Sequence, residues 1–428
     1  MAITGRTPLL LALGLVAVLV RPEPSTVWLW LAVVGALVLL DVALAPSPRT
    51  LRLERDRPGR VRLGEAGETR VRLTAGPRRV RLLVRDGWQP SAGAGQDRHR
   101  VRLGPHESTV LTTTLRPTRR GDRRAVGLTV RSAGPLGLAA RQRTATLAGS
   151  VRALPAFGSR RHLPSRLARL RDLDGRSAVR VRGQGTEFDS LREYVRGDDV
   201  RSIDWRASAR NRSVVVRTWQ PERDRRVVLV LDTSRTSAAR VGDVPRLDAA
   251  MDAALLLGAL AGRAGDRVDL VAGDRRVRAR TRAGGTAVVG ALSEAMADLE
   301  PVLAEADWSG LASAVQALGR HRALVVLLTP LEPAAVEESL LPVLPALTAH
   351  HRVLLASVRD PELAALRTRR DDAAAVYGAA AAEQTLARRA ATASLLERLG
   401  VDVLDADADH LAPALADRYL ALKAAGRL

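Results

Sequence analysis

The sequence contains no cysteine, few aromatic residues and almost no lysine. The missing cysteines exclude disulfide frameworks, thiolate zinc or iron–sulfur centres and a cysteine nucleophile. The seven histidines never form an H-x-x-x-H pair, which argues against a transition-metal site. Only 3% of the residues are aromatic, so surfaces in which arginine alternates with aromatic rings, as nucleic-acid binding requires, are not expected. We therefore predict no nucleic-acid partner.

Basic residues are abundant but unevenly placed. Every one of the 67 basic residues except Lys423 is arginine, and this bias, beside frequent Ala, Gly, Leu and Val, is typical of a GC-rich bacterial genome. Residues 1–226 hold 44 basic and 20 acidic residues, whereas residues 227–428 hold 23 and 26. The net charge of +21 therefore describes one basic half and does not indicate a function for the whole chain.

Two apolar runs near the N-terminus predict a hairpin of two transmembrane helices in residues 1–48. The second run, Val27–Ala45, has 19 residues and as a helix reaches about 28 Å, enough to cross a hydrocarbon core. The first run, Pro8–Val20, is short for a span. It becomes long enough when it is extended back to Ala2 with Arg6 reaching the membrane surface.

The alternative to the hairpin is a cleaved signal peptide. No A-x-A cleavage site follows the first run, and a second apolar run begins after a six-residue loop. Six arginines lie in residues 47–63, whereas the loop Arg21–Thr26 contains one. The positive-inside rule therefore places both ends of the hairpin in the cytoplasm. We predict a multi-pass protein of the bacterial cell membrane, in contact with membrane lipids and with cytoplasmic soluble domains.

Residues 49–150 have the pattern of an all-β, sandwich-like domain. Short runs in which arginine alternates with Val and Leu are separated by turns rich in Pro, Gly and Asp, as in a sheet with one apolar and one polar face. The cationic face could contact anionic lipid or an acidic partner. The simpler interpretation, which we favour, is that codon bias fills exposed strand positions with arginine.

Residues 151–226 form a connector that contains the most distinctive segment of the chain. Thr186 can cap a helix, and the next apolar residues then share one helical face: Phe188, Leu191, Tyr194 and Val195. Val214, Val216 and Thr218 alternate as in a strand.

The run G-x-G-x-E-F-x-x-L-R-x-Y-x-x-G-D-D-x-R-x-I-D-W-x-x-S-A-R, Gly183 to Arg210, resembles the signature of the domain of unknown function 58 family. The Pro-Leu-Gly-Leu turn at 135–138 is similar to the end of that family's β domain. The resemblance implies a MoxR-type AAA+ ATPase as partner and a role in protein-complex assembly or cofactor insertion. The signature residues that it singles out are Glu187, Phe188, Arg192, Tyr194, Gly197, Asp198, Asp199, Arg201, Asp204 and Trp205.

Two interpretations of the signature remain open. In the first it is a packed connector whose arginines pair with neighbouring acids, with Trp205 buried against the next domain. Trp205→Ala would then cost about 3–5 kcal/mol of stability. In the second the signature is a surface on which a partner docks.

Residues 227–428 alternate strand and helix patterns, which predicts a doubly wound α/β sheet; the resemblance implies a von Willebrand factor A-like domain. The expected strands are residues 227–232, 267–273, 276–281, 323–329, 352–358 and 401–407. The expected helices are residues 246–264, 286–299, 308–319, 333–349, 379–399 and 409–424.

The first of these strands ends in a possible metal loop. Asp232, Ser234 and Thr236 give D-x-S-x-T, which resembles the metal-ion-dependent adhesion site, and their oxygens are of the kind that Mg²⁺ prefers. The alternative is that these side chains cap a turn. Pro330 stands where such sites usually carry a second acid, so we expect Mg²⁺ binding to be weak or absent. The usual threonine of the intervening loop is also missing, with Asp307 and Ser309 as the nearest candidates.

The leading functional hypothesis is a membrane-anchored, non-enzymatic adaptor. The rival is a metal-assisted hydrolase built on Asp232, Asp307 and Glu332. Against the rival, no histidine lies near these residues in the sequence, and neither a phosphate-binding P-loop nor a G-x-S-x-G motif is present.

Overall fold

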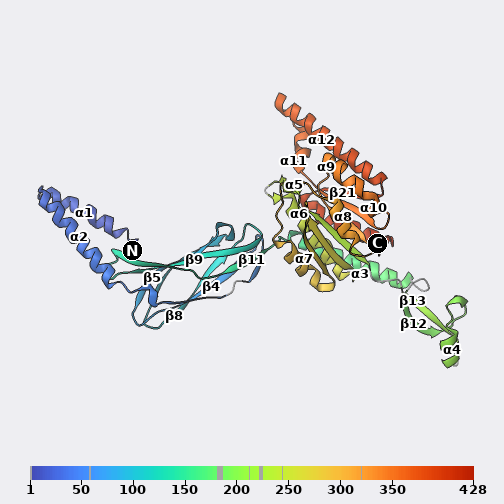
Figure 1. Cartoon of the computed structure of the whole chain (residues 1–428), viewed down its shortest axis with the longest axis horizontal. Helices are drawn as coiled ribbons and strands as arrows, with labels where there is room; N and C mark the ends of the chain where they lie inside the picture. The colour runs from blue at the N-terminus through green and yellow to red at the C-terminus, as the bar shows by residue number, and fades with distance from the viewer. Residues whose placement is uncertain are drawn as a thin grey trace. The chain divides into compact units, whose positions relative to one another are not determined.

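The structure is a computed structural model of the chain (Figure 1). It describes residues 2–56, 59–180, 187–211, 213–220, 225–242, 244–319 and 321–428. The chain divides into two units, Met1–Leu154 and Pro155–Leu428.

Two apolar helices open the first unit. Helix α1 (Arg6–Val20) packs against α2 (Pro24–Leu44), and the indole Nε1 of Trp30 donates to the Leu10 carbonyl at 3.3 Å. A Cβ atom at Gly14 would lie 2.3 Å from the Trp30 ring, so this contact requires glycine. Among the described residues one helical segment, Pro24–Thr50, is long and apolar enough to cross a membrane. One N-terminal apolar helix long enough for a span is confirmed, while a span formed by α1 stays a prediction.

Two β-sheets form the rest of this unit. One has the order β1–β10–β9–β11–β3, with β5 paired to β9 and to β7, and the other has the order β2–β4–β8–β6. Their facing side chains form one core, with Val71 and Leu73 from one sheet and Leu82 and Val130 from the other. This confirms the predicted sandwich-like region. The strands are β1 (Ala2–Ile3), β2 (Arg52–Arg55), β3 (Arg60–Arg62), β4 (Gly67–Thr74), β5 (Val80–Trp88), β6 (Ala94–Gly95), β7 (Arg98–Leu103), β8 (Ser108–Leu115), β9 (Gly121–Ala133), β10 (Ala139–Ala145) and β11 (Ser150–Leu154).

A buried aspartate joins α2 to the sandwich. The carboxylate of Asp41 accepts hydrogen bonds from the backbone N–H groups of Leu136 (2.7 Å), Leu138 (2.7 Å) and Ala139 (2.8 Å). All three donors belong to the Pro-Leu-Gly-Leu turn or the residue after it. A Cβ atom at Gly134 would lie 2.2 Å from Asp41 Oδ1, so the turn closes on the carboxylate only with glycine there. The turn therefore binds the C-terminal end of α2 through these three hydrogen bonds.

The second unit is built on a six-stranded sheet of order β18–β17–β14–β19–β20–β21, in which only β18 is antiparallel. The strands are β14 (Arg226–Asp232), β17 (Arg267–Gly273), β18 (Val277–Ala283), β19 (Leu324–Leu328), β20 (Arg352–Arg359) and β21 (Val401–Asp407). The longer helices are α3 (Leu163–Arg180), α6 (Arg246–Arg263), α7 (Val288–Ala297), α8 (Trp308–Gln316), α11 (Pro361–Thr368), α12 (Ala373–Arg398) and α13 (Ala408–Ala424). These bounds confirm the predicted doubly wound sheet.

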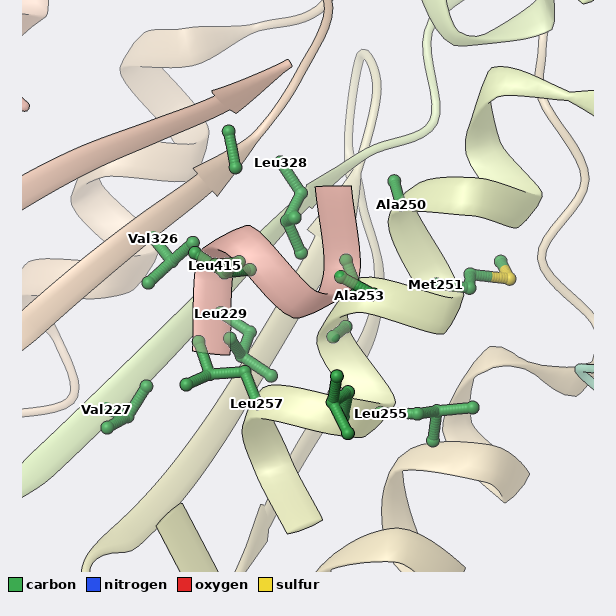
Figure 2. Close-up of a cluster of buried hydrophobic side chains, with 14 of the residues drawn as sticks. Val227, Leu229, Ala250, Met251, Ala253, Leu255, Leu257, Val326, Leu328 and Leu415 are labelled. Carbon is green, nitrogen blue, oxygen red and sulfur yellow. The ribbon is translucent and has the colours of Figure 1, made fainter. Parts of the chain in front are cut away.

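Helices cover both faces of the sheet. Successive residues of β14 point to opposite faces, so Leu229 packs with α6 and α13 while Val230 packs with α8. Figure 2 shows the first of these cores, where Leu257 of α6 and Leu415 of α13 meet Leu229. The result is a three-layered domain whose central strand is buried on both sides.

The structure differs from the expected elements in a broken helix and in helices that were not predicted, among them α3 and α11. The helix expected at 333–349 is broken into α9 (Pro333–Ala335), two short irregular turns and α10 (Leu344–Thr348). Pro342 and Pro345 lack the N–H donors that a continuous helix needs. Helix α3 was not predicted, yet its Leu170 is buried in the α/β core.

Candidate functional site

The predicted metal loop lies at the topological switch point of the sheet. From β14 the chain first adds β17 and β18 on one side, and then crosses to β19 on the other side of β14. Loops at the carboxyl ends of strands at such a reversal leave a crevice in which α/β proteins bind ligands. Asp232 ends β14, and Thr329 follows β19 directly.

The three predicted side chains are brought together around a buried carboxylate. Asp232 is 1% exposed. Its Oδ2 accepts from Thr236 Oγ1 (3.1 Å) and from Thr329 Oγ1 (2.7 Å), and its Oδ1 accepts from the Ser234 N–H (2.8 Å). The Ser234 and Thr236 hydroxyls lie 3.0 Å apart. Burial raises the pKa of Asp232, against the lowering effect of these hydrogen bonds.

Sequence reasoning missed Thr329 as a member of this cluster. The position of Thr329 in the sequence could have identified it. Strands β14 and β19 are parallel neighbours, so the residue that follows β19 lies beside the residues at the end of β14. Asp274, which follows β17, was missed too: it is buried and accepts from Thr233 Oγ1 at 2.8 Å. Asp274 thereby holds the loop after β14 from the β17 side, opposite Thr329 on the β19 side.

The space above the cluster is small. A pocket of about 10 Å³, lined by the cluster together with Glu305, Trp308 and Pro330, has room for about one water molecule. Among the described residues no group of three His, Cys, Asp or Glu side chains could hold a metal ion. The donor oxygens suit Mg²⁺ in kind, but the one carboxylate that they include already accepts three hydrogen bonds.

The acids that the hydrolase hypothesis needs are engaged elsewhere. Glu332 Oε1 accepts from Arg246 Nη1 at 2.8 Å and from Arg389 Nη1 at 3.4 Å. Asp307 caps α8 by accepting from the Gly310 N–H at 2.9 Å. Among the described residues, Asp232, Asp307 and Glu332 therefore do not form a group that could hold a metal ion.

The signature segment folds as a small β hairpin with a helix, which we call the arm. It comprises β12 (Glu187–Glu193), α4 (Trp205–Asn211) and β13 (Val215–Gln220), with β12 antiparallel to β13. The prediction of a helix that carries Phe188, Leu191, Tyr194 and Val195 on one face is therefore wrong. The alternating run that begins at Val214 supplies a partner strand, whereas an isolated helix of this length is marginal.

Asp198, Asp199 and Asp204 hold the arm in shape. Asp198 pairs with Arg192 at 2.5 Å, and Asp204 accepts from Arg217 Nε at 2.8 Å. The Arg192 guanidinium, followed by the Val195 N–H, holds the pKa of Asp198 below its usual range. The Ala207 N–H, followed by Arg217, does the same for the pKa of Asp204. The signature acids are thus used for folding.

Other signature residues are placed by the same turns. Asp199 Oδ1 accepts from the Arg201 N–H at 3.0 Å, and Gly197 has a φ of 115°, which favours glycine. Glu187 and Phe188 pair with Gln220 and Trp219 in the ladder. Thr186, the expected helix cap, lies outside the described residues.

Trp205 is exposed, contrary to the packed-connector interpretation. Its exposed fraction is 67%, while Tyr194 is half-buried. The arm buries only Val215 and Val216 fully among its described side chains, so it is too small to cover a tryptophan at the start of α4. The expected cost of 3–5 kcal/mol for Trp205→Ala is therefore wrong. A substitution at so exposed a position should change stability by about 0.5 kcal/mol or less.

Comparison with known families matches residues 190–391 to the family described as "Protein of unknown function DUF58". This region is a DUF58 domain. It runs from β12 of the arm to α12, and therefore includes most of the signature and the Asp232 cluster. The DUF58 description assigns no specific role. No curated protein matches the chain.

Solved structures show only partial likeness. A protein of unknown function from Porphyromonas gingivalis W83 is 18% identical over 25% of this chain, with a TM-score of 0.21. The chain covers 49% of that protein, about half of its length. A CARDB domain from Pyrococcus furiosus, solved in complex with di-metal ions, is 19% identical over 24% of this chain and 86% of its own, with a TM-score of 0.16.

Proposed function

We propose that this DUF58 protein is a membrane-anchored, non-enzymatic adaptor that works with a MoxR-type AAA+ ATPase in protein-complex assembly or cofactor insertion. The observation that carries the proposal is the chemistry of the switch-point cluster. Its buried carboxylate accepts three hydrogen bonds, and Glu305 is the other acid among the described residues that line the pocket beside it. A carboxylate held by three donors, beside a pocket with room for about one water molecule, is suited to recognition.

Two further features support an adaptor. The apolar segment Pro24–Thr50 is long enough to hold the chain in the bacterial cell membrane. The arm exposes Trp205, and tryptophan is among the residues most enriched at the centres of protein contacts. An adaptor in the membrane needs an anchor and an exposed contact surface on the same chain.

We propose in addition that Mg²⁺ binds to Asp232, Ser234 and Thr236 weakly or not at all. The ion would have to displace hydrogen bonds from Thr236 and Thr329. Asp232 would then be the single carboxylate among these three residues that binds the ion. Mg²⁺ sites generally use one or two carboxylates together with oxygens of the bound ligand.

The ATPase partnership is tested by affinity purification of the detergent-solubilised full chain from its native membranes, followed by mass spectrometry. We expect enrichment of a MoxR-type AAA+ ATPase. We also expect Trp205→Ala to lower the affinity for it about thirtyfold or more, since truncating a central tryptophan typically costs about 2 kcal/mol or more. Tyr377→Ala is the matched control, because Tyr377 is 79% exposed on α12, outside the arm.

Recovery without any AAA+ ATPase would contradict the adaptor. Metal-dependent phosphatase or nuclease turnover by the pure chain, lost in Asp232→Ala, would favour the hydrolase instead.

A further inference from the structure

The end of the β sandwich that holds α2 carries a group of arginines, which we call the collar. Three segments adjoin there: 47–50, which follows α2, 76–81 and 102–107. A Cβ atom at Gly76 would lie 3.0 Å from the Thr50 Cβ, and the His106 N–H donates to the Gly76 carbonyl at 3.0 Å. The three segments therefore form one continuous surface beside the C-terminal end of α2. The collar consists of Arg49, Arg78, Arg79, Arg81 and Arg102.

The collar has a large excess of positive charge. All five of its arginines are exposed, and within the described part of the chain none of their side chains forms a hydrogen bond or an ion pair. The three segments contain one acid, Glu107, whose Oε2 accepts from the Gly104 N–H at 2.6 Å. The nearby Arg52 is left out of the collar because it pairs with Glu54 at 2.8 Å.

The arrangement of the collar lowers the stability of the sheet. Arg81 of β5 lies directly opposite Arg102 of β7, and Arg78 and Arg79 adjoin in the sequence. Like charges directly opposite each other on antiparallel strands are destabilising. Codon bias explains why these residues are arginine and not lysine, but it does not explain why two of them face each other. Such an arrangement is expected where an anionic partner supplies the missing negative charge.

The position of the collar favours a lipid surface as that partner. Leu82, the residue after Arg81, pairs with Ser132 of β9. Ser132 pairs in turn with Arg141 of β10, whose Nε donates to the Val42 carbonyl of α2 at 2.9 Å. The collar thus begins one residue along the sheet from the row that binds α2, the helix long enough to cross a membrane. Headgroups of the lipid begin where the apolar part of such a helix ends.

We propose that the collar binds the headgroups of anionic phospholipids in the membrane that holds α2. Phosphate oxygens accept charge-assisted hydrogen bonds from guanidinium groups. Each arginine near an anionic membrane surface contributes about fivefold to the affinity. The proposal rests on the membrane anchor of the proposed function and does not need its ATPase. It adds a second attachment of the sandwich to the membrane, which depends on the composition of the lipid.

Native mass spectrometry of the full chain in a neutral detergent tests this directly. The chain is titrated with phosphatidylglycerol or with phosphatidylcholine of the same acyl chains, and the dissociation constant of each lipid is measured. We expect phosphatidylglycerol to bind about tenfold more tightly or better. Arg78→Gln with Arg79→Gln should weaken the binding of phosphatidylglycerol about twenty-five-fold, which is fivefold for each arginine. The binding of phosphatidylcholine should stay unchanged.

A matched double variant controls for the loss of charge. Arg116 and Arg119 are exposed and follow the end of β8 that lies away from the collar. Arg116→Gln with Arg119→Gln removes the same charge from the same unit and should leave the affinity for phosphatidylglycerol within about twofold of the parent chain. Melting temperatures equal to that of the parent chain check that both double variants are folded.

Four results would overturn the proposal. Equal affinities for the two lipids would show that the collar does not select anionic headgroups, and equal losses in both double variants would show attraction by the total charge alone. Soluble polyglutamate that binds as tightly as phosphatidylglycerol, and no longer binds Arg78→Gln with Arg79→Gln, would assign the collar to an acidic protein. A chain that stays soluble without detergent and binds neither lipid would contradict the anchor itself, and the collar with it.

Discussion

At the scale of the residue, Asp232 decides what the switch-point crevice can bind. Its carboxylate is buried, its pKa is raised by that burial, and three donors already satisfy it. A cation must compete both with these hydrogen bonds and with a proton. The burial and the hydrogen bonds that hold the Asp232 carboxylate in place therefore also weaken its binding of a metal ion.

We predict that Mg²⁺ binds the full chain with a Kd weaker than about 10 μM, since a single carboxylate supplies all the protein charge. Binding should weaken further as the pH is lowered, because a raised pKa leaves less of the carboxylate ionised and ligands must be deprotonated. Isothermal titration of the detergent-solubilised chain measures both effects. A tighter site that is abolished by Asp232→Asn would show that the loop is a competent metal centre.

The sequence predicted part of this cluster. The spacing D-x-S-x-T was enough to place Asp232, Ser234 and Thr236 together, because all three belong to one short loop. Thr329 lies 97 residues away and enters through the pairing of β14 with β19. The exposure of Trp205 could not be predicted, since it depends on how little surface the arm has available for burial.

At the scale of the element, the contact between α2 and the Pro-Leu-Gly-Leu turn is the most specific in the first unit. Asp41 is fully buried and receives three backbone N–H groups, which would otherwise be left without acceptors. Hydrogen bonds to a charged group contribute about 1.5–3 kcal/mol each. The end of α2 is therefore held to the sandwich by hydrogen bonds as well as by the chain itself.

We predict that Asp41→Ala raises the amide exchange rates of Leu136, Leu138 and Ala139 by about a hundredfold, equivalent to about 3 kcal/mol, because these donors lose their acceptor. Hydrogen exchange with mass spectrometry of the 134–139 segment measures this in detergent. Asp41→Asn keeps one oxygen acceptor and should give a smaller increase. Unchanged protection in Asp41→Ala would show that the turn is held by other contacts.

Elements were predictable from the sequence where their hydrophobic pattern had a single interpretation. Strand β14 is a continuous apolar run and α6 is apolar nearly all round, so each fits a buried position and no other. The segment that forms β12 has its apolar residues Phe188 and Leu191 at helical spacing, and its pairing with β13 overrides that local pattern. Helix α3 had a usable signal that we overlooked, with leucines at 163, 167, 170 and 173.

At the scale of the whole molecule, the charge asymmetry along the sequence predicts the topology. We expect a periplasm-active phosphatase fused after Pro48 to be inactive, because the arginine-rich flank of α2 should stay in the cytoplasm. A fusion after Glu23, in the loop between the two apolar helices, is the matched control and should be active. Activity after Pro48 would reverse the orientation, and inactivity at both positions would leave α2 as an interfacial or buried helix.

The clamp on Asp41 has a mechanical consequence. A flexible tether lets a domain turn freely beneath its anchor, but the clamp grips α2 through a carboxylate and through the Val42 carbonyl, which accepts from Arg141 Nε at 2.9 Å. The two acceptors belong to successive residues of α2. Twisting α2 would therefore turn the sandwich with it, so torque applied to the anchor reaches the sheets.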